Sequence, residues 1–208
     1  MRQFKLDKLY HHVVRTEEKR KKLQGFLIIV LSLLLLVSII IISENPLSDK
    51  FLIWLNKGTQ YSIMTTIYDP ETIRNMNDLF ERDYDYIELV TWVHNHLSIV
   101  DKKPNPVPKN PFDILELGEG RCGEYSILYV AACVSQGYDA RLVIILRGSD
   151  HQWTEVKVNG SWVHVDPTSP PGIYVNEPES LQRWNKTMNL VVAFEKDSYE
   201  IVTEKYSD

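Results

Sequence analysis

The hydrophobic pattern changes from a helical to a strand-like period along the chain. Between residues 69 and 136, apolar residues recur every three or four positions or run continuously, as they do in helices. Beyond residue 140 they form short runs or alternate with polar residues, as they do in strands. The predicted helices are Pro70–Phe80, Tyr86–Val100 and Cys122–Gln136, and the predicted strands are Arg141–Leu146, the hairpin Val156–Val163, Asn189–Phe194 and Tyr199–Thr203. This order predicts an α+β fold in which the Cys122 helix packs on an antiparallel sheet.

The dipeptide Asn159-Gly160 predicts a two-residue hairpin turn, which fixes how the two strands pair. Such a turn pairs residue 158 with 161 and, further out, 153 with 166. Because side chains alternate between the two faces of a strand, one face carries several polar and aromatic side chains. These are His151, Trp153, Trp162, His164 and Asp166. His151 and Asp166 become diagonal neighbours, roughly 7–8 Å apart at Cα, so the imidazole can reach the carboxylate. For His164 a structural role is favoured over a binding role.

Cys122 lies in the first turn of the predicted helix, where unpaired backbone N–H groups and the helix dipole favour an anion such as a thiolate. An isolated cysteine is more often a small buried hydrophobic residue, and Cys133, in the middle of the same helix, fits that alternative. A chemical role for Cys122 therefore depends on His151 and Asp166. Together the three residues supply the thiol, imidazole and carboxylate of a nucleophilic catalytic unit.

Three motifs in this order resemble the transglutaminase-like superfamily of cysteine hydrolases and acyl transferases. They are GRCGEYS at Gly120–Ser126, DHQWTEV at Asp150–Val156 and WVHVDP at Trp162–Pro167. The likeness is closest to the peptide:N-glycanase branch, and it covers residues 65–208. Further segments that resemble motifs of this branch are Trp92–Asn95, Leu181–Lys186, Val191–Phe194, Val202–Thr203 and Tyr206.

The resemblance implies a papain-like cysteine hydrolase fold with Cys122 as nucleophile, His151 as base and Asp166 as the group that orients the base. The expected chemistry is attack on an amide, through a thioester that water hydrolyses or that an incoming lysine amine accepts. If the branch resemblance holds, the amide is a glycosylated Asn of a glycoprotein substrate. Trp92 is a candidate second oxyanion donor, and Trp153 is a candidate wall of the substrate site.

No metal or other cofactor is expected. The peptide:N-glycanase branch usually carries two Cys-x-x-Cys pairs that bind a structural zinc ahead of the nucleophile. This chain has two cysteines in all, so the four thiolates of such a site cannot be supplied. The departure leaves the substrate open. A cysteine peptidase or a protein cross-linking transglutaminase on the same fold is an alternative, and so is a non-catalytic, membrane-anchored binding module.

The segment Phe26–Ile42 contains only apolar residues and two serines, which predicts a single-pass transmembrane anchor over residues 26–43. The cationic stretch Arg15–Lys22 before it predicts a cytoplasmic N-terminus and a catalytic domain outside the cell membrane. A cleaved signal peptide is the alternative, but Ile41–Asn45 lacks an Ala-x-Ala-like site. The predicted division is a basic tail at 1–25, the anchor at 26–43, a linker and lead-in at 44–64, and the catalytic domain at 65–208.

Charge follows this division. Residues 1–25 carry a net charge of +5 and the remainder −10, which gives the −5 of the whole chain. A basic tail fits contact with a lipid bilayer, and an acidic domain argues against a nucleic acid partner. The oligomeric state has no signature in the sequence. The expected function is that of a membrane-anchored thiol amidohydrolase acting on a protein or glycoprotein.

Overall fold

The computed structural model describes residues 22–38, 46–101, 108–168 and 188–206. The chain divides into two compact units, Met1–Leu52 and Ile53–Asp208. The motifs at residues 120–126, 150–156 and 162–167 all lie in the second unit, whereas the matching segment 181–186 lies outside the described residues.

The first unit corrects the prediction of a transmembrane anchor over residues 26–43. Residues 22–38 are helical, but no helix in the described ranges is both long enough and apolar enough to cross a membrane. This finding contradicts the predicted single-pass topology with a cytoplasmic N-terminus and an external catalytic domain, and contact with a lipid bilayer stays a prediction. Residues 39–43 of the predicted anchor lie outside the described residues.

After the helix at residues 22–38, five more helices precede the main sheet in the described part of the chain. They are α2 (Pro46–Ile67), α3 (Pro70–Asn77), α4 (Glu88–His96), α5 (Pro111–Leu117) and α6 (Cys122–Ser135). Asp69 caps the N-terminus of α3, because its carboxylate accepts the backbone N–H groups of Glu71 and Thr72. The predicted helix Tyr86–Val100 is shorter than expected. It ends at His96, after which Ser98–Ile99 forms the short strand β1 and pairs in parallel with β2 (Glu119–Gly120).

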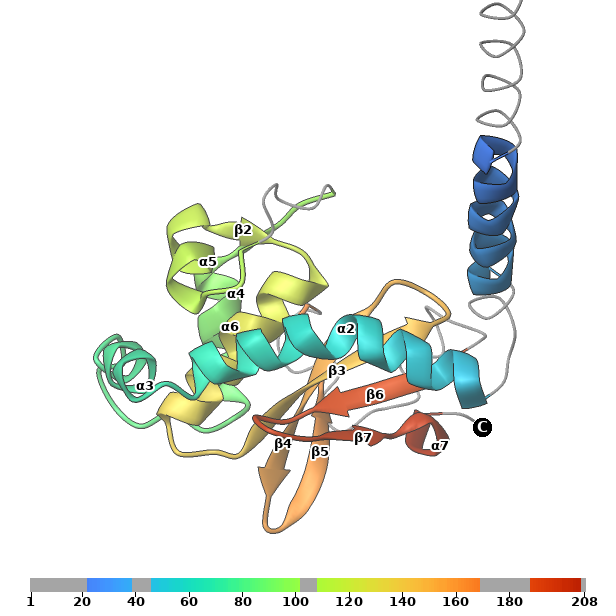
Figure 1. Cartoon of the computed structure of the whole chain (residues 1–208). Helices are drawn as coiled ribbons and strands as arrows, with labels where there is room; N and C mark the ends of the chain where they lie inside the picture. The colour runs from blue at the N-terminus through green and yellow to red at the C-terminus, as the bar shows by residue number, and fades with distance from the viewer. Residues whose placement is uncertain (1–21, 39–45, 102–107, 169–187, 207–208) are drawn as a thin grey trace, which may run out of the picture. The chain divides into compact units, whose positions relative to one another are not determined.

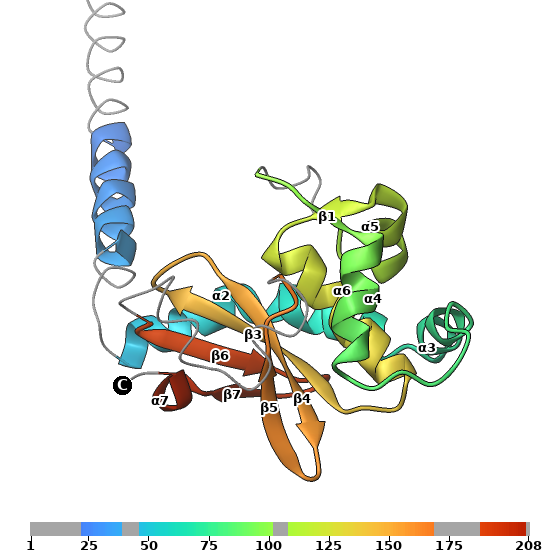
Figure 2. The ribbon, with the colours of Figure 1, turned by 180° about the vertical axis from the view of Figure 1, so that it is seen from behind.

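The main sheet has five antiparallel strands. They are β3 (Ala140–Arg147), β4 (Gln152–Val158), β5 (Ser161–Val165), β6 (Leu190–Phe194) and β7 (Tyr199–Ile201), arranged in the order β5-β4-β3-β6-β7. The short helix α7 (Thr203–Tyr206) follows β7. Figures 1 and 2 show α3, α4, α5 and α6 grouped together, with the β4–β5 hairpin extending away from them. The predicted α+β arrangement of helices first and strands afterwards is confirmed.

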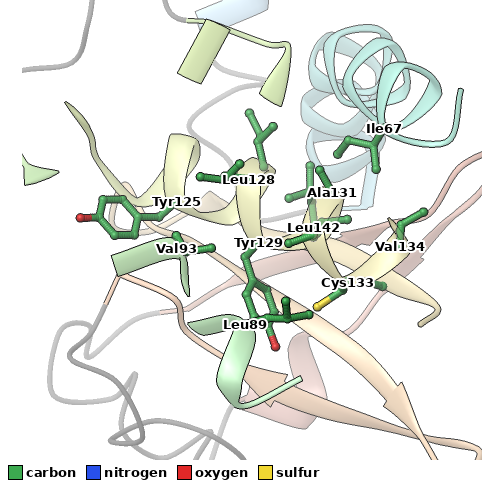
Figure 3. Packing of buried hydrophobic residues seen from close by; sticks show 14 of the residues in the cluster. Ile67, Leu89, Val93, Tyr125, Leu128, Tyr129, Ala131, Cys133, Val134 and Leu142 are labelled. Carbon is green, nitrogen blue, oxygen red and sulfur yellow. The ribbon is translucent and has the colours of Figure 1, made fainter. Parts of the chain in front are cut away.

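Helix α6 forms the centre of the main core, and its apolar sequence explains why. It is buried on nearly all sides, packing against α4 through Leu89 and Val93 and against β3 through Leu142 (Figure 3). A helix that is apolar all round needs partners all round, and the sheet and the surrounding helices supply them. The opposite face of the sheet has a second, smaller core that includes Trp153 and Tyr206. Helix α6 lies between the other helices and one face of the sheet, and this position fixes where Cys122 lies.

Candidate active site

Cys122 is the first residue of α6, and the backbone before it is held in a tight conformation. The backbone N–H of Arg121 donates to the Glu124 carboxylate at 2.8 Å, which joins the residue before the helix to its first turn. Glu124 is 2% exposed, and its Cβ lies so close to Gly120 that a Cβ on that residue would approach it to 2.5 Å. Glycine at position 120 is therefore required for this approach. Cys122 itself remains partly accessible.

The β4–β5 hairpin brings His151 and Asp166 together as the predicted register requires. Asn159 and Gly160 both adopt positive φ, 51° and 82°, as a two-residue hairpin turn demands. The observed pairs run from Val158–Ser161 to Thr154–Val165, which confirms the register. His151 Nε2 lies 2.9 Å from Asp166 Oδ2. The other carboxylate oxygen of Asp166 accepts the backbone N–H of Thr168 at 3.0 Å, so both oxygens are engaged.

The imidazole of His151 connects the carboxylate to the thiol. It also interacts with the side chain of Cys122, which favours the protonated imidazole. Burial alone would lower the pKa of His151, but the hydrogen bonds and negative charges of Asp166 and Cys122 outweigh it and raise that pKa to about 10. The arrangement therefore favours an imidazolium between two acidic groups.

Asp166 is stabilised as a carboxylate even though it is 5% exposed. Burial would raise its pKa, but the hydrogen bond and charge of His151 and the N–H of Thr168 together lower it below the usual value. The neighbouring His164 behaves in the opposite way. It is 1% exposed, neither ring nitrogen has a hydrogen-bond partner in the described part of the chain, and burial lowers its pKa to about 4. His164 is therefore neutral at physiological pH.

The structure places the two tryptophans away from open surface. Trp153 is fully buried, and its ring stacks on His151 with centroids 5.9 Å apart and planes at 27°. Trp92 lies on α4, and the centroid of its ring is 4.8 Å from that of Phe80 and 4.1 Å from that of His96. The roles of Trp153 as substrate wall and Trp92 as oxyanion donor stay predictions.

A hydrogen bond that sequence reasoning missed ties the two halves of the site together. Ser126 lies one helical turn after Cys122, is fully buried, and donates through Oγ to the carbonyl oxygen of Gln152 at 3.3 Å. Gln152 follows His151 directly, so this bond joins the helix that carries the thiol to the strand that carries the imidazole. The i, i+4 spacing of Cys122 and Ser126 places both residues on one face of the predicted helix, and this was the signal in the sequence that Ser126 lies near the site.

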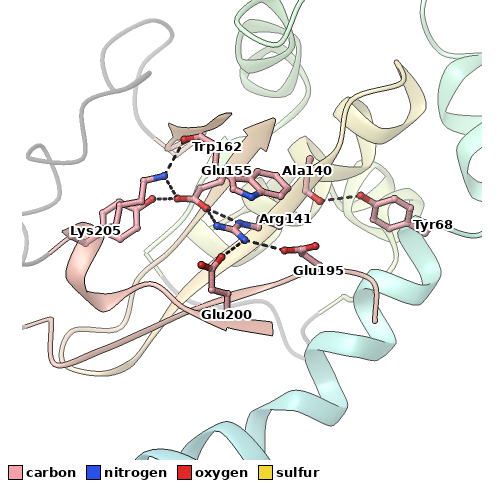
Figure 4. Close-up of polar contacts among 9 residues, drawn as sticks. Tyr68, Ala140, Arg141, Glu155, Trp162, Glu195, Glu200 and Lys205 are labelled. Carbon is pink, nitrogen blue, oxygen red and sulfur yellow. Dashed lines mark hydrogen bonds and ion pairs between the residues drawn. The ribbon is translucent and has the colours of Figure 1, made fainter. Parts of the chain in front are cut away.

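A second charged cluster occupies the same face of the β4–β5 hairpin. Glu155 is fully buried, and its carboxylate contacts Arg141 at 2.6 Å, Lys205 at 2.5 Å and the Tyr206 hydroxyl at 2.6 Å (Figure 4). Burial would raise the pKa of Glu155, but these donors and cations lower it. Arg141 extends the cluster to the carboxylates of Glu195 and Glu200 at the edge of the sheet. No group of three His, Cys, Asp or Glu within the described ranges could hold a metal ion.

Comparison with known proteins relates this site to a family. A model of the transglutaminase-like superfamily matches residues 71–167, which include all three residues of the site. Peptide-N(4)-(N-acetyl-beta-glucosaminyl)asparagine amidase from Oryza sativa subsp. japonica is 41% identical over 100 residues, 47% of this chain and 22% of the relative. The enzyme of the same name from Saccharomyces cerevisiae is 36% identical over 108 residues, 49% of this chain and 27% of the relative. The chain thus matches only about a quarter of the length of these relatives.

Among solved structures, Rad4–Rad23 crosslinked to undamaged DNA superposes with a TM-score of 0.55 at 12% identity. The match covers 76% of this chain and 48% of that one. A second Rad4–Rad23 structure, bound to a 6-4 photoproduct UV lesion, superposes with a TM-score of 0.53 at 13% identity, over 75% of this chain and 47% of that one. At this identity the likeness shows a shared fold alone, because one fold can carry unrelated activities.

Proposed function

We propose that this chain is a cysteine-dependent amide hydrolase that uses Cys122, His151 and Asp166, because residues 71–167 match a model of the transglutaminase-like superfamily. The observation that carries the proposal is the contact of one partly buried imidazole with both a carboxylate and a thiol at a helix start. An imidazole held in this way can keep a thiolate available and can later give its proton to a leaving amine.

The proposed reaction has two steps. The Cys122 thiolate attacks the amide carbonyl carbon, and the oxyanion that develops is stabilised by the backbone N–H of Cys122 at the start of α6. The His151 imidazolium donates its proton to the nitrogen as the C–N bond breaks, which releases an amine and leaves a thioester. Water, deprotonated by the now neutral His151, attacks the thioester, and the thiol leaves with a carboxylic acid as product. Asp166 orients the imidazole and stabilises its positive charge through both transfers.

The substrate we propose is the side-chain amide of a glycosylated asparagine. The similarity to the asparagine amidases of rice and yeast supports it, since these relatives are 41% and 36% identical to this chain over about half of its length. Hydrolysis would convert the asparagine to aspartate and release the intact glycan as a glycosylamine. The partner is then an N-glycosylated protein or peptide.

A defined N-glycopeptide tests the proposal, with mass spectrometry of both the peptide and the released sugar. The expected result is conversion of Asn to Asp with the peptide backbone intact, abolished in Cys122→Ala and retained in Cys133→Ala. Backbone cleavage would identify a peptidase instead, and transfer to an added lysine amine a cross-linking enzyme. No reaction, with Cys122 alkylated no faster than a free thiol, would overturn the proposal in favour of a binding module.

A further inference from the structure

The C-terminal helix α7 lies outside the segment that matches the family model, yet it packs on the part of the sheet that holds His151. The match ends at residue 167, and α7 begins at Thr203. Tyr206 at its end is 3% exposed and belongs to the second core together with Trp153. The fold therefore returns a distant segment of the chain to the back of the candidate site.

Two ring contacts lead from α7 to the imidazole. The ring of Tyr206 meets Trp153 edge-on, with centroids 4.9 Å apart and planes at 77°. Trp153 in turn stacks on His151 with centroids 5.9 Å apart. Because Trp153 is fully buried and close-packed, it has no free space in which to change position while Tyr206 stays in place. The orientation of the His151 ring is thus limited on the side that faces Trp153.

Side-chain hydrogen bonds hold α7 against the sheet, among them the bond of Lys205 Nζ to Glu155 Oε1. The Tyr206 hydroxyl donates to Glu155 Oε1 at 2.6 Å, and Lys205 Nζ donates to the carbonyl oxygen of Trp162 at 3.0 Å (Figure 4). Thr203 Oγ1 accepts the backbone N–H of Val191 at 2.9 Å. A helix of four residues has little stability by itself, so these bonds and the packing of Tyr206 determine its position.

We propose that Tyr206 is a positioning residue for His151, acting through its ring on Trp153. The inference rests on the proposed function in that His151 is taken as the acid and base of the reaction. The effect on His151 can still be tested independently of the substrate, because the ring contacts bear on the orientation of the imidazole whatever substrate the site accepts.

The experiment measures the titration of His151 by NMR in protein labelled at histidine, together with the alkylation rate of Cys122 at neutral pH. Tyr206→Leu removes the ring, Tyr206→Phe keeps it, and Tyr199→Leu removes a half-exposed ring on β7 as a matched control. The charged and titratable groups around His151 are Asp166, Cys122 and His164, and none of them is altered in these variants.

The expected result is a fall of about one unit in the His151 titration midpoint in Tyr206→Leu, with about a ten-fold slower alkylation of Cys122. Tyr206→Phe and Tyr199→Leu should keep both values close to those of the unmodified chain. An unchanged midpoint in Tyr206→Leu would overturn the proposal, and so would an equal fall in Tyr206→Phe, since that assigns the effect to the hydroxyl. If Tyr206→Leu does not fold, Trp153→Phe decides in the same way. Neither readout needs a substrate, so a negative glycopeptide assay leaves this test intact.

Discussion

Asp166 and Glu155 are two buried carboxylates on the same face of one hairpin, and the chain surrounds them differently. Glu155 contacts two cations and a hydroxyl, with each oxygen engaged by at least one of them. Asp166 contacts one imidazole and one backbone N–H. The side chain of His151 is 19% exposed and leads on to Cys122, which is partly accessible. The Glu155 cluster extends through Arg141 to the exposed carboxylates of Glu195 and Glu200, whereas the Asp166 cluster ends at the Cys122 thiol.

The difference shows how similar charged groups serve stability in one place and chemistry in another. A buried charge costs several kcal/mol unless it is paired. The cations and the hydroxyl around Glu155 supply this pairing, and none of them leads on to a thiol. Around Asp166 the requirement is met by a group that can itself gain or lose a proton. We therefore expect changes in the first cluster to affect unfolding and changes in the second to affect rate.

The two cysteines give the largest expected contrast. Cys122→Ala should reduce amide hydrolysis by about 10⁴-fold or more, because the covalent route is lost. Cys133→Ala should retain the rate, since Cys133 is fully buried in α6 and burial raises its pKa. Initial rates on an N-glycopeptide measure both. Comparable losses in the two folded variants would contradict the assignment of Cys122.

Asp166→Asn should be the next most severe change for rate. It keeps the shape of the side chain but removes the charge that supports the imidazolium, for which a loss of roughly 10³-fold is expected. The pKa of His151 should fall from its present value of about 10. Steady-state rates and an NMR titration of His151 measure the two effects, and a variant with a normal rate would refute the proposed role.

Glu155→Gln should instead act on stability. It leaves Arg141 and Lys205 without their buried counter-charge, which should cost about 3–5 kcal/mol of unfolding free energy. Chemical denaturation measures this cost. The rate per folded molecule should stay within a few-fold of the unmodified chain, and a rate loss as large as that of Asp166→Asn would show that the two clusters are not separate.

His164, between the two clusters, should dominate the acid side of the stability profile. Its folded pKa of about 4 lies below the roughly 6.5 of an unfolded histidine, so unfolding takes up a proton as the pH falls. The stability that His164 contributes is present above pH 6.5 and is lost as the pH falls through 4. When the pH is lowered from 7 to 4, the free energy of unfolding of His164→Leu should therefore fall by about 3 kcal/mol less than that of the unmodified chain. Urea denaturation at each pH measures both free energies of unfolding. If they fall in parallel as the pH is lowered, the assigned role of His164 is contradicted.

Local signals in the sequence predicted the elements around the site well. Asn159-Gly160 fixed the hairpin register, and with it the meeting of His151 and Asp166, because a two-residue turn leaves one way to pair the strands. The start of α6 at Cys122 followed from the apolar run that begins there. These features depend on neighbouring residues, which is why the sequence was sufficient.

Features that depend on distant contacts were missed or wrong. The charged residues Arg141 and Glu155 lie within short strands, where such residues usually face solvent. Glu155 is paired with Lys205, 50 residues later, and Arg141 is paired with Glu155 and with Glu195 and Glu200. Most of the segment 44–64, expected as linker and lead-in, is helical from Pro46 onward. The anchor at 26–43 was inferred from hydropathy alone, and the helix observed there ends its described part at residue 38.

The central claim is that His151 and Asp166 keep Cys122 reactive, and the pH dependence of Cys122 alkylation tests it most directly. With iodoacetamide and peptide mapping, Cys133 in the same molecule serves as the unreactive reference. At pH 6 we predict that Cys122 reacts at least about ten-fold faster than a free thiol, and that His151→Ala abolishes this advantage. A rate equal to that of a free thiol across the pH range, unchanged in His151→Ala, would contradict the account.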